Sequence, residues 1–380
     1  MKNILFIANS DSNWLGGVYY VRNIVYQFLM YPSTANTFRV FIYLDKEVEQ
    51  VFDFCKKYKN VKFVYRKRSI IEKKDTVLSR KYTSMKLISV VCKEKIDYIY
   101  PYFSHNAILK DKSVSWIADF QHYGLKHLFT QKEYDERTEY FFDIACNHYK
   151  LILSSQDAYE TYKKLFPNNL QDVYIVPFIS ALDEKDIAEE CSEEVLRKYS
   201  ISNSNYFLVA NQFWQHKNHK IVIEALSILK GKGYDNIVVV CTGLTKDYRN
   251  QHYFDDLMSE IHSDNIENNI KILGMIPREE QLQLMKGALA VVQPSLFEGW
   301  GTVVEDAKTL QKRIVLSDID VHKEQANADC VFFGRNNARQ LADILLNIWQ
   351  EKKAYVSKVN YNYKEQAAEY GKLFYEALIS

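Results

Sequence analysis

Short apolar runs rich in Val, Ile, Phe and Tyr recur along the whole chain, separated by stretches long enough to form helices. Runs of about 4–8 apolar residues bounded by turn residues predict buried strands. Strands that alternate with helices favour a parallel sheet with crossover helices on its faces. In the first half of the chain, the predicted strands are residues 4–8, 40–44, 61–65, 98–102, 115–118, 151–154 and 173–177.

A second series follows residues 183–194, a segment that is dense in acids and lacks a strand pattern. A break of this kind is typical of a link between domains. We therefore predict an α/β protein of two doubly wound, Rossmann-like domains, residues 1–182 and 195–358, whose parallel sheets face each other across a cleft. The strands predicted for the second domain are residues 206–210, 237–242, 270–273, 290–293, 314–316 and 331–333.

Length and charge add two features. A chain of 380 residues with 47% hydrophobic content is large enough for two domains with cores of their own. The net charge of +1 hides an asymmetry, because residues 1–180 carry 26 Lys and Arg against 19 Asp and Glu, and the remainder carries 23 against 29. Residues 56–86 contain twelve basic residues and only two acidic residues, Glu72 and Asp75. Such a run binds lipid headgroups or nucleic acid, or is simply the solvated face of a helix.

The six cysteines are scattered without a C-x-x-C pair, so the sequence predicts neither a metal nor a disulfide framework. The first apolar run has only five residues, too few for a signal peptide. No later segment approaches the ~18 apolar residues of a membrane span. We expect a cytoplasmic protein with reduced thiols.

The clearest chemical pattern lies between residues 291 and 325, where an apolar strand, a glycine-containing loop, a helix and a second strand follow one another. Glycine lets a ligand approach the backbone, and the N–H groups and dipole of a helix N-terminus favour a phosphate. Acids flank this corner, so it offers amides to an anion and carboxylates to hydroxyl groups. The alternative is an ordinary strand–helix corner whose acids suit the helix dipole. The corner comprises Glu298, Gly299, Trp300, Gly301, Thr302, Glu305 and Asp306.

This corner resembles the signature of retaining GT-B glycosyltransferases of family 4, in which E-G-F-G is followed by a second acid eight positions after the first. Counting from Glu298, that position is Asp306, with Glu305 beside it as the competing assignment, and Ala307 is also in step. The resemblance implies that Glu298 and the glycine amides contact the sugar hydroxyls and diphosphate of a nucleotide-sugar donor. The second acid would accept hydrogen bonds from the ribose.

Two more loops of the second domain resemble loops of this family that bind the donor. Where the family has an arginine and, five positions later, a lysine that hold the donor pyrophosphate, this chain has Gln212 and Lys217. Gln212 removes one positive charge, and neighbouring side chains of the loop or the glycine amides are the alternatives for replacing it. The loop that contains Met275 and Ile276 is similar to the turn that meets the nucleotide base.

In the first domain, Gly16 and Gly17 stand between a predicted strand and an amphipathic helix, and we include them among the donor-binding candidates. Their loop is not G-x-G-x-x-G, which argues against a dinucleotide site. His122 follows another strand, where family members place a histidine near the transferred sugar, and Asp119 lies on the same loop. The family's final helix, here residues 361–380, packs back on the N-terminal domain.

The resemblance implies a retaining hexosyltransferase that needs no metal or cofactor and acts on a saccharide or lipid-linked saccharide, in bacterial surface polysaccharide synthesis (lipopolysaccharide, O-antigen or capsule). The candidate catalytic residues are Lys217, Glu298 and His122. Residues 318–320 spell D-x-D, which we interpret as coincidence because it follows the donor helix. In relatives that decorate lipid-linked sugars, the first domain docks on the inner membrane face through basic and aromatic residues, which suggests the same for residues 56–86. We expect no nucleic-acid partner. The alternatives are a GT-B-fold epimerase or phosphorylase, and a non-catalytic sugar-nucleotide-binding protein.

Overall fold

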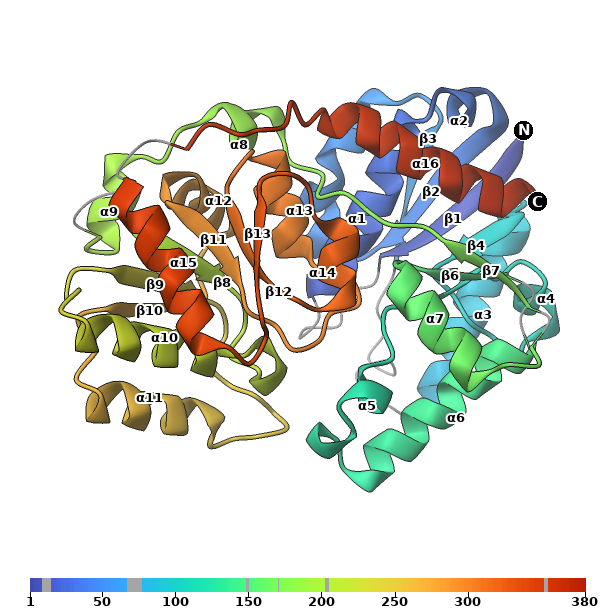
Figure 1. Ribbon diagram of the computed structural model, residues 1–380. Coiled ribbons are helices and arrows are strands. Elements are labelled where there is room, and N and C mark those ends of the chain that lie inside the picture. Colours follow the sequence, from blue (N-terminus) through green and yellow to red (C-terminus); the bar gives the residue numbers. More distant parts are fainter. Residues whose placement is uncertain (9–14, 67–76, 148–149, 170, 202–204, 352–354) are drawn as a thin grey trace. The chain divides into compact units, whose positions relative to one another are not determined.

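The computed structural model describes the chain except residues 9–14, 67–76, 148–149, 170, 202–204 and 352–354 (Figure 1). The chain forms two compact units. Unit 1 comprises residues 1–120, 135–181 and 363–380, and unit 2 comprises residues 121–134 and 182–362. The short segment 121–134 therefore belongs with the second half of the chain, although it lies between strands of the first series.

The first sheet of unit 1 has four parallel strands in the order β3-β2-β1-β4. In the middle of the sheet, Ile4 of β1 pairs with Val40 of β2 on one side and with Tyr98 of β4 on the other. Strand β1 is buried from Ile4 onward, as expected for a parallel strand covered on both faces. The bounds are β1 (Lys2–Ala8), β2 (Phe38–Leu44), β3 (Val61–Tyr65) and β4 (Tyr98–Tyr100).

Three further parallel strands form a second sheet in the order β5-β6-β7, and a parallel bridge between Ile99 and Ser113 brings the chain before β5 beside β4. Helix α7 begins where the Ser155 hydroxyl accepts a hydrogen bond from the Ala158 N–H at 3.1 Å, which is an ordinary N-cap. The strands are β5 (Ser115–Ile117), β6 (Lys150–Leu153) and β7 (Asp172–Ile175). The helices before residue 182 are α1 (Leu15–Met30), α2 (Pro32–Thr37), η1 (Lys46–Lys57), α3 (Val77–Lys93), α4 (Ala107–Lys110), α5 (Gln121–Gly124), η3 (Lys126–Leu128), α6 (Gln131–Asn147) and α7 (Gln156–Leu165).

The last helix, α16 (Tyr363–Ile379), packs against α1 within unit 1 (Figure 1). Gly371 lets the two backbones approach closely, because a Cβ there would lie 1.9 Å from the carbonyl oxygen of Gln27. The rings of Phe28 and Phe374 meet edge to face beside this contact, with centroids 5.2 Å apart. Residues 363–380 thus complete the core of a unit whose other elements precede residue 182.

Unit 2 contains one six-stranded parallel sheet in the order β10-β9-β8-β11-β12-β13. In chain order this is 3-2-1-4-5-6, so the direction of winding reverses between β8 and β11. Ligands of doubly wound sheets bind outside the carboxyl ends of the strands at such a switch point. The strands are β8 (Tyr206–Ala210), β9 (Val238–Thr242), β10 (Ile270–Gly274), β11 (Ala290–Gln293), β12 (Ile314–Ser317) and β13 (Cys330–Phe333).

Both faces of this sheet carry buried apolar clusters. One includes Phe207 and Ile221, and the other includes Leu208 and Val304. The apolar strands are therefore covered on both sides, which is why they read as continuous hydrophobic runs. The helices are α8 (Glu184–Ala188), α9 (Glu193–Lys198), η4 (Gln215–Lys217), α10 (His219–Gly231), α11 (Tyr253–Ser263), α12 (Arg278–Gly287), α13 (Thr302–Thr309), α14 (Asp320–Gln325) and α15 (Ala338–Glu351).

The predicted strands are confirmed, and no bound differs by more than two residues. The strand predicted over residues 98–102 ends at Tyr100, because Pro101 has no N–H to donate to a sheet. The acidic segment 183–194 has no strand, as predicted, and contains α8 and the start of α9. Among the described residues, no helix is both long and apolar enough to cross a membrane.

Candidate functional site

Two loops meet at the switch point of the unit 2 sheet, one after β8 and one after β11. Asn211 and Gln293, at the carboxyl ends of these strands, exchange two side-chain hydrogen bonds of 2.8 and 3.2 Å. The Leu296 N–H donates to the His216 carbonyl at 2.8 Å. The loops are therefore fastened together at two points, and each of them carries one predicted catalytic residue.

Those residues, Lys217 and Glu298, form an ion pair with 2.6 Å between Nζ and Oε1. The same Oε1 accepts hydrogen bonds from Gln293 Nε2 at 2.8 Å and from Ser295 Oγ at 2.7 Å. No described residue donates to the other oxygen, Oε2. Burial raises the pKa of Glu298, but the Lys217 ammonium and the Ser295 hydroxyl outweigh it and hold the pKa at about 2. Glu298 is thus an ionised carboxylate with one oxygen fixed and the other left to accept from a ligand.

Two histidines beside this pair are neutral at physiological pH. Burial and the nearby Lys217 charge lower the pKa of His216 to about 2 and that of His219 to about 3. His219 also stacks on Phe213, with ring centroids 4.0 Å apart. Because neither imidazole is protonated, neither competes with Lys217 for the Glu298 carboxylate.

The glycine corner is held by a side chain from α14. The Gly301 N–H donates to Gln325 Oε1 at 2.9 Å, and Gln325 Nε2 donates back to the Gly301 carbonyl at 3.2 Å. The Gly301 N–H, predicted to contact the donor, is therefore occupied. The next N–H groups, of Thr302 and Val303 in the first turn of α13, have no hydrogen-bond partner among the described residues. Together with the helix dipole, they are the amides that remain for an anion.

The two competing acids of α13 point to different partners. Glu305 is buried and accepts from Gln325 Nε2 at 3.0 Å and Lys308 Nζ at 3.1 Å, while burial raises its pKa. Asp306 is equally buried and pairs with Arg278, whose side chain is 28% exposed. Arg278 follows the predicted base-contacting loop directly. Asp306 therefore faces that loop, whereas Glu305 contacts Gln325, the side chain that is hydrogen-bonded to Gly301.

Gln212 lies against the loop that follows β9. The Phe213 N–H donates to the Leu244 carbonyl at 2.9 Å, and Gly243 adopts a φ of +131°. A Cβ at Gly243 would lie 2.2 Å from the Asn211 carbonyl oxygen, so glycine is required for this approach. In the predicted base loop, Met275 is exposed and Ile276 is partly buried against one apolar cluster.

The remaining candidates lie in other surroundings. Gly16 and Gly17 open α1 in unit 1, and most of the preceding loop lies outside the described residues. His122 is fully buried in unit 2, where its ring meets those of Tyr123, Phe129 and Tyr134. Gly299 and Trp300 occupy the corner itself, with Trp300 buried.

The D-x-D residues are engaged in local ion pairs. Asp318 pairs with Arg335 at 3.1 Å, and Asp320 pairs with Lys323 at 2.8 Å. In the part of the chain that the structure describes, no group of three or more His, Cys, Asp or Glu side chains is arranged so that it could hold a metal ion.

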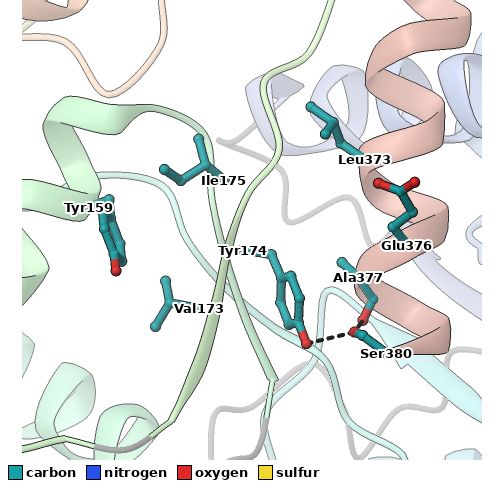
Figure 2. A pocket seen from close by; sticks show the side chains of 8 residues that line it. All are labelled: Tyr159, Val173, Tyr174, Ile175, Leu373, Glu376, Ala377 and Ser380. Atoms are coloured by element: carbon teal, nitrogen blue, oxygen red, sulfur yellow. Dashed lines mark hydrogen bonds between the residues drawn. The ribbon is translucent and has the colours of Figure 1, made fainter.

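A separate pocket of about 440 Å³ lies in unit 1, between β7, α7 and α16 (Figure 2). Its wall includes Tyr174, whose hydroxyl is 2.6 Å from Ser380 Oγ, and Glu376. None of the predicted site residues lines this pocket.

Several residues of the unit 2 site escaped prediction: Asn211, Gln293, Arg249, Arg278 and Gln325. Only the first two carried a usable signal, since each is a polar residue at the carboxyl end of a predicted apolar strand. The other three are ordinary surface residue types without periodicity.

Comparison with solved structures gives the fold class of this protein. Among solved structures, this chain is similar to HepE of Anabaena in complex with UDP and glucose (16% identity, 100% of this chain and 99% of that chain, TM-score 0.65). It is also similar to a glycosyltransferase of Rickettsia africae (13%, 98% and 93%, 0.64) and to WaaG, a glycosyltransferase involved in lipopolysaccharide biosynthesis (13%, 98% and 98%, 0.60). The chain has the GT-B fold, with parallel Rossmann-like sheets.

Part of the chain also matches a known protein family. Residues 192–369, which contain the Lys217–Glu298 site, match the family Glycosyl transferases group 1. The match supports a glycosyltransferase. No curated protein matches the chain.

Proposed function

We propose that this protein transfers a sugar from a nucleoside-diphosphate sugar to a saccharide or lipid-linked acceptor, with retention of anomeric configuration and without a metal. The observation that carries the proposal is the Lys217–Glu298 pair at the switch point, next to the first-turn amides of α13. An ammonium and two backbone N–H groups suit a diphosphate, and an ionised carboxylate with an uncommitted oxygen suits sugar hydroxyls.

In this mechanism, Lys217 stabilises the charge that develops on the departing phosphate. A donor placed at such a charge contributes roughly 3 kcal/mol, or about 10²-fold in rate. Glu298 Oε2 accepts a hydrogen bond from a hydroxyl of the transferred sugar. Asp306, beside the base loop, is the assignment we favour over Glu305 for the ribose, because Glu305 is engaged with the Gln325 clamp.

Retention without a covalent intermediate is the mechanism that we propose for this site. Glu298 Oε1 accepts three hydrogen bonds, one of them from an ammonium, which makes this oxygen a poor nucleophile, and Oε2 is assigned to a hydroxyl of the transferred sugar. The acceptor hydroxyl oxygen therefore bonds to the anomeric carbon on the face that the phosphate leaves. The bond between the anomeric carbon and the phosphate oxygen breaks, and the nucleoside diphosphate takes the hydroxyl proton.

The donor is tested first by thermal shift with UDP, GDP, dTDP and ADP sugars, because a bound donor raises the melting temperature according to its affinity. UDP-glucose heads the panel, since HepE was crystallised with it. Turnover is then followed with and without saccharide acceptors. Release of nucleoside diphosphate that depends on an acceptor supports a transferase. Release without any acceptor indicates an epimerase, and binding with no turnover at all indicates a non-catalytic protein.

We further propose that the acceptor belongs to a bacterial surface polysaccharide and that residues 56–86 bind the anionic inner face of the membrane. Within the described part of this run, Lys56 pairs with Asp53 at 2.6 Å and Lys62 with Glu94 at 2.8 Å, so these charges are partly neutralised. At ~1 kcal/mol per basic residue near an anionic surface, the others suffice for reversible binding. Equal sedimentation with anionic and neutral vesicles at moderate salt would refute this.

A further inference from the structure

Arg249, on the loop after β9, is a buried cation that no prediction used. Its side chain is 6% exposed, and each edge of the guanidinium has a separate partner. Nη1 donates to Gln121 Oε1 at 2.8 Å, and Nη2 donates to His216 Nδ1 at 3.1 Å. Nε lies 3.5 Å from Asp247 Oδ1. Because arginine has no acceptor, His216 Nδ1 must be the accepting nitrogen, which leaves the proton on Nε2.

Aromatic rings and a carboxylate compensate for the burial of this charge. The guanidinium carbon lies 5.2–5.6 Å from the ring centroids of Phe129, Trp214 and Tyr248. Asp247 is itself fixed, since its Oδ2 accepts from the Gln215 N–H at 2.9 Å. A planar cation with this many directional partners is set in one orientation.

One of these contacts reaches the Lys217–Glu298 pair. His216 directly precedes Lys217, its ring is held by Arg249, and its carbonyl accepts the Leu296 N–H two residues before Glu298. Arg249 therefore orients the residue that joins the two loops of the site.

The other contacts reach His122. Gln121 directly precedes it, and Phe129, which also meets the Arg249 guanidinium, has its ring against that of His122. Within the same unit, a Cβ at Gly124 would lie 3.1 Å from the ring of Phe297, the residue before Glu298. The short segment 121–134 is thus held at Gln121 and Phe129 by a single guanidinium.

We propose that Arg249 is a positioning residue. It fixes the position of segment 121–134, which contains His122, relative to Lys217 and Glu298. The proposal rests on the function proposed above for this site. Arg249 itself touches neither Lys217 nor Glu298 in any described contact, so its effect passes through His216 and Gln121.

The kinetic test compares Arg249→Met and Arg249→Lys with the wild type. Misplacing reacting groups by about 1 Å costs about 10²-fold, so we expect Arg249→Met to lower kcat by that order while the Kd for UDP changes less than about threefold. Arg249→Lys keeps the charge but cannot bridge two acceptors in a plane, so it should restore less than half of the loss. The matched control is Arg313→Met, because Arg313 also pairs with an acid, Glu351, and lies over a ring, that of Tyr355.

A spectroscopic test needs no turnover. With selective ¹⁵N labelling of the nine histidines in one sample and of the glutamines in a second, the His216 ring should show the Nε2–H tautomer with a hydrogen-bonded Nδ1 in the wild type. In Arg249→Met the Nδ1 signal should move to that of a free acceptor, and the Gln121 side-chain amide signals should shift as well.

Unchanged kcat in a folded Arg249→Met variant, full recovery by Arg249→Lys, or unmoved His216 and Gln121 signals would each overturn the proposal. If Arg249→Met fails to fold, Gln121→Leu removes the hydrogen bond between Arg249 and Gln121 and should still lower kcat without changing the Kd for UDP. If the wild type neither binds nor turns over a nucleotide sugar, the proposed function fails, and the ¹⁵N signals still decide the arrangement around Arg249.

Discussion

The side-chain amide of Gln325 holds both backbone polar groups of Gly301, accepting from its N–H at 2.9 Å and donating to its carbonyl at 3.2 Å. It also donates to Glu305 at 3.0 Å. In Gln325→Leu the Gly301 N–H loses its hydrogen-bond acceptor, whereas the Gly301 carbonyl still accepts from the Val304 and Glu305 N–H groups and Glu305 still accepts from Lys308. One buried unsatisfied N–H group should lower the free energy of unfolding by about 2 kcal/mol, measured by urea denaturation.

The chain provides a matched control for this clamp. The Gly334 N–H donates to Gln340 Oε1 at 2.8 Å, a bond of the same kind that is exposed to solvent. Water replaces the lost partner in Gln340→Leu, so its cost should stay below about 1 kcal/mol. Equal losses in the two variants would show that Gln325 does not fix the corner.

The second prediction concerns Lys217→Ala. Removing the ammonium takes away a donor to the leaving phosphate, so sugar transfer should fall at least tenfold, toward about 10²-fold. Lys220→Ala is the control, because Lys220 is an exposed lysine three residues further on, near Glu260. A Lys217→Ala variant with unchanged turnover would remove Lys217 from the mechanism.

The same variant should raise the pKa of Glu298. Burial alone raises the pKa of Glu298, and the Lys217 ammonium is the largest opposing influence, so the pKa should move up from about 2. In the wild type, the low folded-state pKa contributes stability that is present above about pH 4.3, the unfolded value, and is lost as pH falls toward 2. That acid-side loss should shrink in Lys217→Ala, as measured by thermal denaturation across pH.

Strand predictions succeeded because fully buried parallel strands leave a strong local signal. β8 reads Tyr-Phe-Leu-Val-Ala and β11 reads Ala-Val-Val-Gln, with turn or helix signals on both sides. The assignment of segment 121–134 to unit 2 left no such signal. It depends on Arg249 and Phe297, which lie more than a hundred residues away in sequence.

The site was predictable only where its chemistry is local. The Glu298 corner could be recognised because glycines, acids and the helix start are consecutive. Its environment was not predictable: the predicted donor amide of Gly301 is occupied by Gln325, and the two acids of α13 face different partners. A glutamine carries no periodic or charge signal, so only the folded arrangement shows what it binds.

A third prediction follows from His322, which is fully buried beside the site. Its Nδ1–H donates to the Ser317 carbonyl at 3.0 Å, and burial lowers its pKa to about 4. An unfolded histidine binds protons near pH 6.5, so the unfolded state gains protons first on acidification. Stability is therefore full above about pH 6.5 and falls as pH drops toward 4, by up to about 3 kcal/mol for this residue.

His322→Gln removes this titration, so the decline in melting temperature between pH 6.5 and 4 should be shallower than in the wild type. His216 and His219 have lowered pKa values too and will leave part of the decline in place. His262→Gln is the control, because His262 is an exposed residue paired with Glu267. A slope identical to the wild type in His322→Gln would mean that His322 is not buried in its neutral form.

The last prediction concerns the packing of α16 on α1. In Gly371→Ala, the new Cβ would lie 1.9 Å from the Gln27 carbonyl oxygen and 2.7 Å from its carbon, so the helices must separate. Overpacking of this kind costs about 3 kcal/mol, which thermal denaturation would register as a lower melting temperature. Gly231→Ala in α10 is the matched control, since nothing lies within 4 Å of its Cβ position. Alanine there should stabilise the protein by up to about 1 kcal/mol through its higher helix propensity. A Gly371→Ala variant as stable as the wild type would contradict the close packing of α1 and α16.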